Sequence, residues 1–490
     1  MGALRRTWRR FRRRPPATQL GSLALVIVVI AGVVVAVVAS SSGGSGSPSV
    51  GQAVSVSQAS TSTRGVTATE INVVFPVANL DNLSNTEGFA GDPEDTEQVD
   101  AINLYVKEIN DNGGINGRKI HPIIVSIDPT NDAEMRAQCK DWTEGTPAAF
   151  AVVDGLGTWS GDNQLCITQE GSTPFIGAWT TVTDWTRMGA PYLWWTGPDQ
   201  ASILAALVSW GESSGLLSPS IKVGVVSSSQ PDDSLALNNY LLPDLRKVGI
   251  TPLVETMDAN PADSATTASQ APLIVQRLKA AGIQSLIPLI PFNAWFPELQ
   301  AQTQQQFFPK LLLSDYASTI TVGLGLIPVP YEKALDGQEG ISTLTLGGID
   351  DPRPESQGGY DPQVRSCYNT WLAAYPKTPP GKKSPHLEEQ GPVVGWCQAI
   401  RLFAAAAIKA GRNLNRRTFV EAMAGIRNFP GTWTPVLSYG PNKFYGPTEY
   451  QVVRIHNNDP NHNACTLTFQ NIPQGTCWQV VQSWRPLPPP

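Results

Sequence analysis

The stretch KEINDNGGINGRKIHPIIVSID, Lys107–Asp128, carries the signals that decide the fold. The apolar residues around its start recur three or four positions apart, the spacing of one helical face; they are Val99, Ile102, Tyr105, Val106 and Ile109. Asn110–Gly114 then ends this helix, because asparagine and glycine tolerate the left-handed conformation that closes a helix. After a second turn at Asn116–Gly117, the branched apolar run Ile120–Ile127 predicts a strand buried on both faces.

The segment before this helix supplies another strand, GVTATEINVVFPV at Gly65–Val77. Strand, helix, glycine turn and strand make a right-handed crossover unit of an α/β fold. Strands and helices go on alternating, and Lys222–Val226 opens a second series, which indicates parallel sheets. A chain of 490 residues is too long for one compact core, so at least two lobes are expected.

The N-terminus has the composition of a membrane anchor. Residues 1–18 form a basic tail with seven arginines and no acid, although the whole chain carries a net charge of −6. Residues 19–39 are uncharged and apolar, long enough to cross a bilayer, and the arginines mark their cytoplasmic side. A cleaved signal peptide is the alternative, but its apolar region is usually shorter. Residues 40–64, rich in serine and glycine, predict a flexible linker.

Six cysteines in an exported chain predict disulfides, although the sequence leaves every pairing open. Their clustering favours Cys139–Cys166, Cys367–Cys397 and Cys465–Cys477. No pair has the spacing of a zinc ribbon or a thioredoxin-like site. His456, His462 and Cys465 are too loosely spaced to indicate a metal site, and we expect neither metal nor cofactor.

The order GVTxxEI, strand, helix, GGINGRKI, strand resembles the type I periplasmic binding proteins. Within them it is most similar to the leucine/isoleucine/valine-binding branch, the solute receptors of branched-chain amino-acid ABC transporters. The resemblance implies two Rossmann-like lobes joined by three chain crossings. Lobe 1 would comprise 65–194 and 341–440, and lobe 2 would comprise 195–340 and 441–490. The crossings are expected near 194–198, 337–341 and 439–444. Relatives also carry a disulfide in a place similar to Cys139–Cys166.

Two loops of lobe 1 are candidates for ligand binding, because ligands of open α/β sheets sit beyond the carboxyl ends of the strands. The first, Gly155–Gly161, offers the hydroxyls of Thr158 and Ser160 and a following helix N-terminus, which favours a carboxylate. A plain strand–helix turn is the alternative, and the spacing is not that of a dinucleotide fingerprint. The resemblance implies that this loop and Ala178–Thr181, with Thr180 and Thr181, hold the ligand's carboxylate.

Aromatic residues and one acid complete the predicted site. Trp159 and Trp179 either line the cleft, which would favour a larger apolar or aromatic ligand, or pack in the core. The resemblance places Phe292 at an aromatic position of lobe 2 and Asp315 where an acid pairs with the ligand's ammonium. Asp315 could instead be a helix N-cap or a surface acid. Ser228–Asp233 departs from the family's pattern, which weakens any inference of ligand identity.

These observations predict a membrane-anchored extracytoplasmic receptor rather than an enzyme. It would capture an amino acid, amide or related carboxylate between its lobes and present it to an ABC permease. No nucleic-acid partner is expected. A sensor without a transporter and an exported enzyme are the alternatives. No nucleophile elbow, phosphate loop or zinc-protease motif occurs in the sequence.

Overall fold

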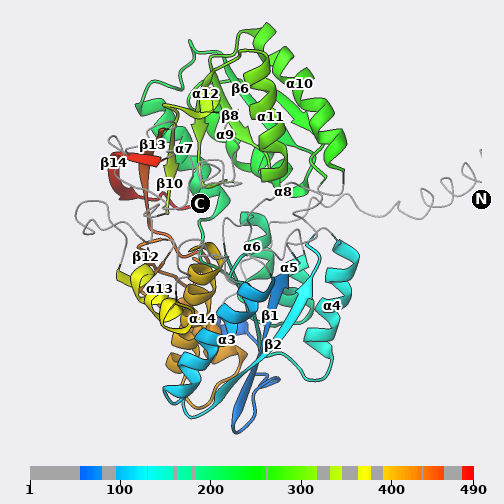
Figure 1. The fold of residues 1–490 in the computed structure, drawn as a ribbon, viewed down its shortest axis with the longest axis vertical. Helices are drawn as coiled ribbons and strands as arrows, with labels where there is room; N and C mark the ends of the chain where they lie inside the picture. The colour runs from blue at the N-terminus through cyan, green and yellow to red at the C-terminus, as the bar shows by residue number, and fades with distance from the viewer. Residues whose placement is uncertain are drawn as a thin grey trace, which may run out of the picture. The chain divides into compact units, whose positions relative to one another are not determined.

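The computed structural model describes residues 56–79, 95–129, 131–157, 163–178, 182–260, 263–316, 332–344, 362–376, 390–432, 434–456 and 477–490. Residues Ala53–Pro490 form one compact unit with two main β-sheets (Figure 1). The predicted α/β class is confirmed. No helix within the described ranges is long and apolar enough to cross a membrane. The expected span at 19–39 and most of the linker lie outside those ranges.

The first sheet is parallel throughout, with the order β2-β1-β3-β4-β5. Its strands are β1 (Glu70–Ala78), β2 (Lys119–Ile127), β3 (Ala151–Val153), β4 (Phe175–Gly177) and β5 (Leu193–Trp195). The intervening helices are α3 (Asp95–Asp111), α4 (Asp132–Glu144), α5 (Asn163–Leu165), the π-helical turn η3 (Cys166–Glu170) and α6 (Thr183–Gly189). A single helical turn, η2 (Val56–Gln58), precedes β1.

The Lys107–Asp128 stretch forms the end of α3, a left-handed turn and β2. Gly114 and Asn116 have φ of 66° and 52°, the left-handed region that the sequence predicted. β2 then pairs in parallel with β1 along the length of both strands. The expectation of burial on both faces is wrong, because β2 is the edge strand and Ile123–Val125 are only partly buried. Pro122, which has no N–H to donate, fits an edge strand.

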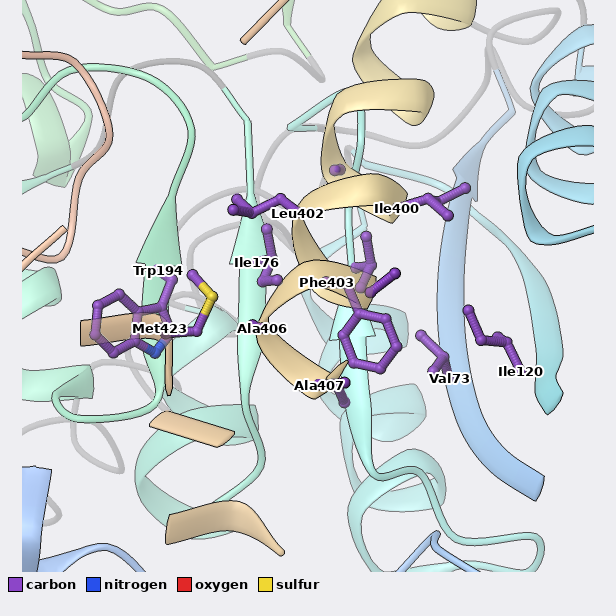
Figure 2. Close-up of a cluster of buried hydrophobic side chains, with 14 of the residues drawn as sticks. Val73, Ile120, Ile176, Trp194, Ile400, Leu402, Phe403, Ala406, Ala407 and Met423 are labelled. Atoms are coloured by element: carbon purple, nitrogen blue, oxygen red, sulfur yellow. The ribbon is translucent and has the colours of Figure 1, made fainter. Parts of the chain in front are cut away.

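Helices from late in the chain complete the core of the first sheet. They are α13 (Pro362–Ala374), α14 (Gln390–Ala410) and α15 (Arg416–Ala424). Figure 2 shows Phe403 of α14 among Val73 of β1 and Ile176 of β4, and all three belong to one buried cluster. The core of the first sheet is therefore built from two parts of the chain that are distant in sequence, the segment around α3 and the segment from α13 to α15.

The second sheet is mixed, with the order β14-β13-β10-β9-β8-β6-β7. Its strands are β6 (Val223–Ser228), β7 (Leu253–Met257), β8 (Ser285–Leu289), β9 (Lys310–Leu313), β10 (Glu339–Ser342), β13 (Glu449–His456) and β14 (Cys477–Pro486). β6 to β10 pair in parallel, whereas β13 runs antiparallel to both β10 and β14. The mixed sheet differs from a purely parallel Rossmann-like one.

Helices pack against the second sheet, and its buried apolar side chains form two separate clusters. The helices are α7 (Gln200–Ser213), α8 (Pro231–Leu235), the π-helical η4 (Ala236–Leu241), α9 (Leu242–Lys247), α10 (Ser264–Ala281), α11 (Phe292–Gln304) and α12 (Glu332–Leu335). One cluster centres on α10 and α11 with Trp295, and the other on α7 with Trp210. A short hairpin, β11 (Phe429–Pro430) and β12 (Val436–Leu437), follows α15.

Two connecting segments run side by side between the elements of the two sheets. Trp195, at the end of β5, donates its N–H to the carbonyl of Phe444 at 2.8 Å. The Tyr439 hydroxyl donates to the Trp195 carbonyl at 3.0 Å. The expected crossing at 337–341 falls instead largely within β10, which pairs with β9 and β13, so the chain leaves the second sheet after Ser342. The domain boundaries as a whole stay a prediction.

Two of the three predicted disulfides are confirmed. Cys139–Cys166 ties α4 to η3, and Cys367–Cys397 ties α13 to α14. The predicted Cys465–Cys477 pair lies outside the part of the chain whose side chains the structure describes.

Candidate functional site

The carboxyl ends of the parallel strands are where ligands bind in open α/β sheets, and the predicted site residues follow these ends. Six of them lie outside the described residues, namely Thr158, Trp159, Ser160, Trp179, Thr180 and Thr181. Phe292 is the first residue of α11, directly after β8, but its side chain is not among those described. Asp315 alone has a described side chain, so whether these residues converge stays a prediction.

A buried aspartate shapes the start of the first predicted loop. Asp154 directly follows β3, is fully buried, and accepts the N–H groups of Leu156 at 3.1 Å and Gly157 at 2.8 Å. Gly157 has φ of 68°, which favours glycine, and a Cβ on Gly155 would lie 2.6 Å from the Trp396 ring. The described start of the loop therefore depends on two glycines and on an acid, Asp154, that the sequence argument did not single out.

Asp315 is buried beyond the end of β9. Its carboxylate accepts hydrogen bonds from the last residue of β10 and from the residue that follows β10. Its Oδ1 accepts the Ser342 hydroxyl at 2.7 Å, and its Oδ2 accepts the Thr343 N–H at 2.5 Å and the Thr343 hydroxyl at 2.6 Å. Burial raises the pKa of Asp315, and these hydrogen bonds oppose that rise. Asp315 is neither a surface acid nor an N-cap of a described helix.

A second buried acid was not predicted. Asp233, in α8 after β6, accepts the hydroxyls of Ser228 and Tyr316. Tyr316 in turn accepts a hydrogen bond from the Gln200 side chain at 3.2 Å. Burial raises the pKa of Asp233 well above its usual range, the neighbouring Asp232 adds to the rise, and the two hydroxyls oppose it.

This hydrogen-bonded chain joins the ends of β6 and β9 to the first residue of α7. Its members lie 83 and 116 positions apart in sequence, so no local motif points to them. The acidic Ser228–Asp233 segment, already noted as a departure from the family pattern, was the one available signal. Together with Asp315, these residues give the second sheet's strand ends a polar, acidic character.

The family is established by sequence. A profile of the periplasmic binding protein family matches residues 83–459, well over half of the chain and parts of both sheets. The chain therefore belongs to the periplasmic binding proteins, and the resemblance to their type I, leucine/isoleucine/valine-binding-like branch is confirmed. Members of this family are substrate-binding proteins.

Solved structures share the fold at low sequence identity. One is a fatty acid ABC transporter substrate-binding protein from Thermomonospora curvata, with a TM-score of 0.59 and 16% identity over 86% of this chain and 93% of that one. Another is a solute binding protein of an ABC transporter from Rhodopseudomonas palustris BisB5 in complex with 3,4-dihydroxy benzoic acid, with a TM-score of 0.58 and 14% identity over 85% and 98%.

A third is a possible leucine/isoleucine/valine-binding protein from Rhodopirellula baltica SH 1, with a TM-score of 0.57 and 15% identity over 79% of this chain and 94% of that one. Identities this low show the fold and do not transfer a ligand. A search of curated protein sequences gives no match.

Proposed function

We propose that this chain is an extracytoplasmic solute receptor that captures a small carboxylate-bearing ligand between its lobes and presents it to an ABC permease. The observation that carries this proposal is the family match, which extends across residues 83–459 and so includes elements of both sheets. A receptor that closes over its ligand needs polar groups at the strand ends of both lobes. The buried polar residues Asp154, Asp233 and Asp315 lie at such ends.

In the proposed complex, Thr158, Ser160, Thr180 and Thr181 hold the ligand's carboxylate, and Trp159, Trp179 and Phe292 contact its apolar part. The ligand class remains broader than the amino acids and amides that the sequence suggested. Structural neighbours have titles that name a fatty acid transporter and a bound dihydroxybenzoic acid. An aromatic or aliphatic carboxylate is therefore included among the candidates.

A thermal-shift screen of the full chain in mild detergent tests the receptor function. Amino acids, amides, hydroxybenzoates and fatty acids would each be titrated, because a ligand that binds only the folded state raises Tm with concentration. A shift confined to one chemical class, and lost in Thr181→Ala, is the expected result. Mass spectrometry of the recovered ligand tests the enzyme alternative, since chemical conversion would contradict a receptor.

Asp315→Asn tests the proposed ammonium contact. The substitution keeps the size of the side chain but removes its charge, so ligands that carry an ammonium should bind about tenfold or more weakly, and plain carboxylates should be little affected. Asp233→Asn is the matched control, because it makes the same exchange at another buried acid among the strand ends of the second sheet. Equal losses for both ligand types would show that Asp315 supports the fold around β9 and β10 and does not contact an ammonium.

We also propose that residues 19–39 anchor the receptor and that residues 40–64 tether it near its permease, which would raise the effective concentration of the pair. Alkaline carbonate washing of membranes should leave the chain in the pellet. Release into the supernatant, with a mature N-terminus after Ala39, would favour the cleaved signal peptide instead. Binding of a ligand without a copurifying permease would favour the sensor alternative.

A further inference from the structure

Helix α6 makes hydrogen bonds through adjacent residues to a connecting segment and to an element beside the second sheet. It lies between β4 and β5 of the first sheet in sequence. The Thr183 hydroxyl donates to Asp199 at 2.8 Å, just before α7. The next residue, Asp184, accepts the side-chain amide of Asn239 at 3.0 Å and the hydroxyl of Tyr240 at 3.1 Å. α6 is thus tied on one side to a connecting segment and on the other to η4.

The partners of Asp184 belong to the second sheet's part of the chain. Asn239 and Tyr240 lie in η4, between β6 and β7. A small apolar patch accompanies the polar contact: Leu235, just before η4, packs against a cluster formed by Leu165, Val182 and Trp185. This cluster is separate from the cores of both sheets. The contact between α6 and η4 therefore lies outside the hydrophobic cores of the two sheets.

The contact is weak in comparison with the connecting segments. Asp184 and Tyr240 are partly buried and Asn239 is exposed, so their bonds are partly accessible to water and each contributes little. By contrast, Trp195 and Phe444 lie in the two connecting segments, where the chain itself runs from one sheet to the other, and a backbone hydrogen bond joins them. The chain itself links the two sheets at the connecting segments, whereas the α6–η4 link consists of hydrogen bonds and a small apolar contact.

A π-helical segment lies on each side of this contact. η4 is a π-helical segment inside a run of helix from α8 to α9, and η3 is another that directly follows α5 and its Leu165. π-helical turns are rare and occur frequently at functional sites, because they shift the helix register at some cost in regularity. Both register shifts lie beside the patch that joins the two sheets' elements.

We propose that Asp184, Asn239 and Tyr240 form a closing latch, which holds the two lobes together and separates when they open. The proposal deepens the solute-receptor function, because α6 follows β4, whose carboxyl end is a predicted ligand position. Asp184 and Tyr240 act as positioning residues: they touch no ligand and set the balance between the open and closed forms. A weaker latch would lower ligand affinity by making closure less favourable.

The test measures opening without a ligand, so it stands even if no ligand is found. Hydroxyl-radical footprinting with mass spectrometry on the full chain in detergent would report the oxidation rate of Trp185, which is 8% exposed. Trp194, which is fully buried in the first core, serves as the internal reference. The variants are Tyr240→Phe and Asp184→Ala, with Tyr375→Phe as the matched control, since Tyr375 bonds Asp100 within the elements of the first core.

In Tyr240→Phe, Trp185 oxidation should rise by roughly fivefold, because one lost hydrogen bond to Asp184 changes an equilibrium by about that factor. Asp184→Ala should raise it at least as much, because this change also removes the bond from Asn239. Trp194 should not change, and Tyr375→Phe should match the unsubstituted protein. The double variant should add little to Asp184→Ala, because the bond between Asp184 and Tyr240 is already lost there and Tyr240→Phe further removes only a 3.5 Å contact with Arg187. Unchanged oxidation of Trp185 would overturn the proposal. A parallel rise at Trp194 would also overturn it, because the substitution would then be unfolding the core.

Discussion

At the scale of single residues, Glu298 of α11 is a buried acid outside the candidate site. It is fully buried, and its Oε1 accepts the Gln302 amide at 3.1 Å, while its Oε2 has no hydrogen-bond partner among the described residues. Burial raises the pKa of Glu298 to about 8, and the Gln302 hydrogen bond opposes that rise. The carboxyl is therefore protonated in the folded protein at neutral pH.

This raised pKa predicts a pH dependence of stability. Below an ordinary pKa of 4.5, Glu298 is protonated in both the folded and the unfolded chain. From there to about pH 8 the unfolded chain ionises first, so the free energy of unfolding should fall, by at most about 1.4 kcal/mol per pH unit. Urea unfolding from pH 5 to pH 9 should show this decline, and Glu298→Gln should flatten it.

The control for this experiment is Glu421→Gln, which changes an exposed carboxylate on α15 and should leave the pH profile as it is. A profile that Glu298→Gln leaves unaltered would mean that Glu298 ionises in the folded state as it does in the unfolded chain.

At the scale of elements, the connecting segment around residues 438–447 depends on one lysine. The Lys443 Nζ lies 2.6–3.1 Å from the backbone carbonyls of Ser438, Tyr445, Gly446 and Pro447, so four acceptors share its N–H groups. It also lies 4.0 Å from the centre of the Tyr445 ring. These carbonyls belong to an irregular segment, in which the Gly446 carbonyl also accepts the Ser438 N–H at 2.8 Å.

Replacing this lysine by an apolar side chain of similar length should destabilise the protein. Lys443→Met should lower the free energy of unfolding by about 2–3 kcal/mol, since it removes a charged donor from several partly buried carbonyls. Lys409→Met is the control, because Lys409 is exposed and bonds one carbonyl, that of Gly425. Similar losses from both variants in urea unfolding would contradict a special role for the Lys443 cluster.

Sequence patterns predict some of these elements and not others. α3, its glycine turn and β2 follow from periodicity and turn chemistry within a few residues of each other. The burial of β2 could not be predicted in this way, because an edge strand and a central strand can share one apolar pattern, and the sheet order decides between them. The hydrogen bonds that link Asp233, Tyr316 and Gln200 could not be predicted either, since these residues come together only in the tertiary fold.

At the scale of the whole molecule, the first sheet cannot complete its core from the N-terminal part alone. Phe150 before β3 packs edge-on against Phe419 of α15, with ring centres 5.6 Å apart. The Tyr105 hydroxyl of α3 donates to the Cys367 carbonyl of α13 at 2.8 Å. Arg401 of α14 pairs with Glu108 of α3 at 2.8 Å. The second sheet's strands β6 to β10 lie between these contributions in sequence.

This interleaving predicts that cutting the chain after the second sheet's parallel strands disrupts the first sheet. A chain that ends at residue 344 lacks α13, α14 and α15, so the apolar face that they cover would be exposed to water. We expect it to aggregate or to bind a hydrophobic dye strongly. Coexpression with residues 345–490 should restore solubility and the slow amide exchange of β1 and α3. Equally slow exchange in the truncated chain alone would show that the first sheet is stable without its C-terminal helices, and that the two parts of its core are independent.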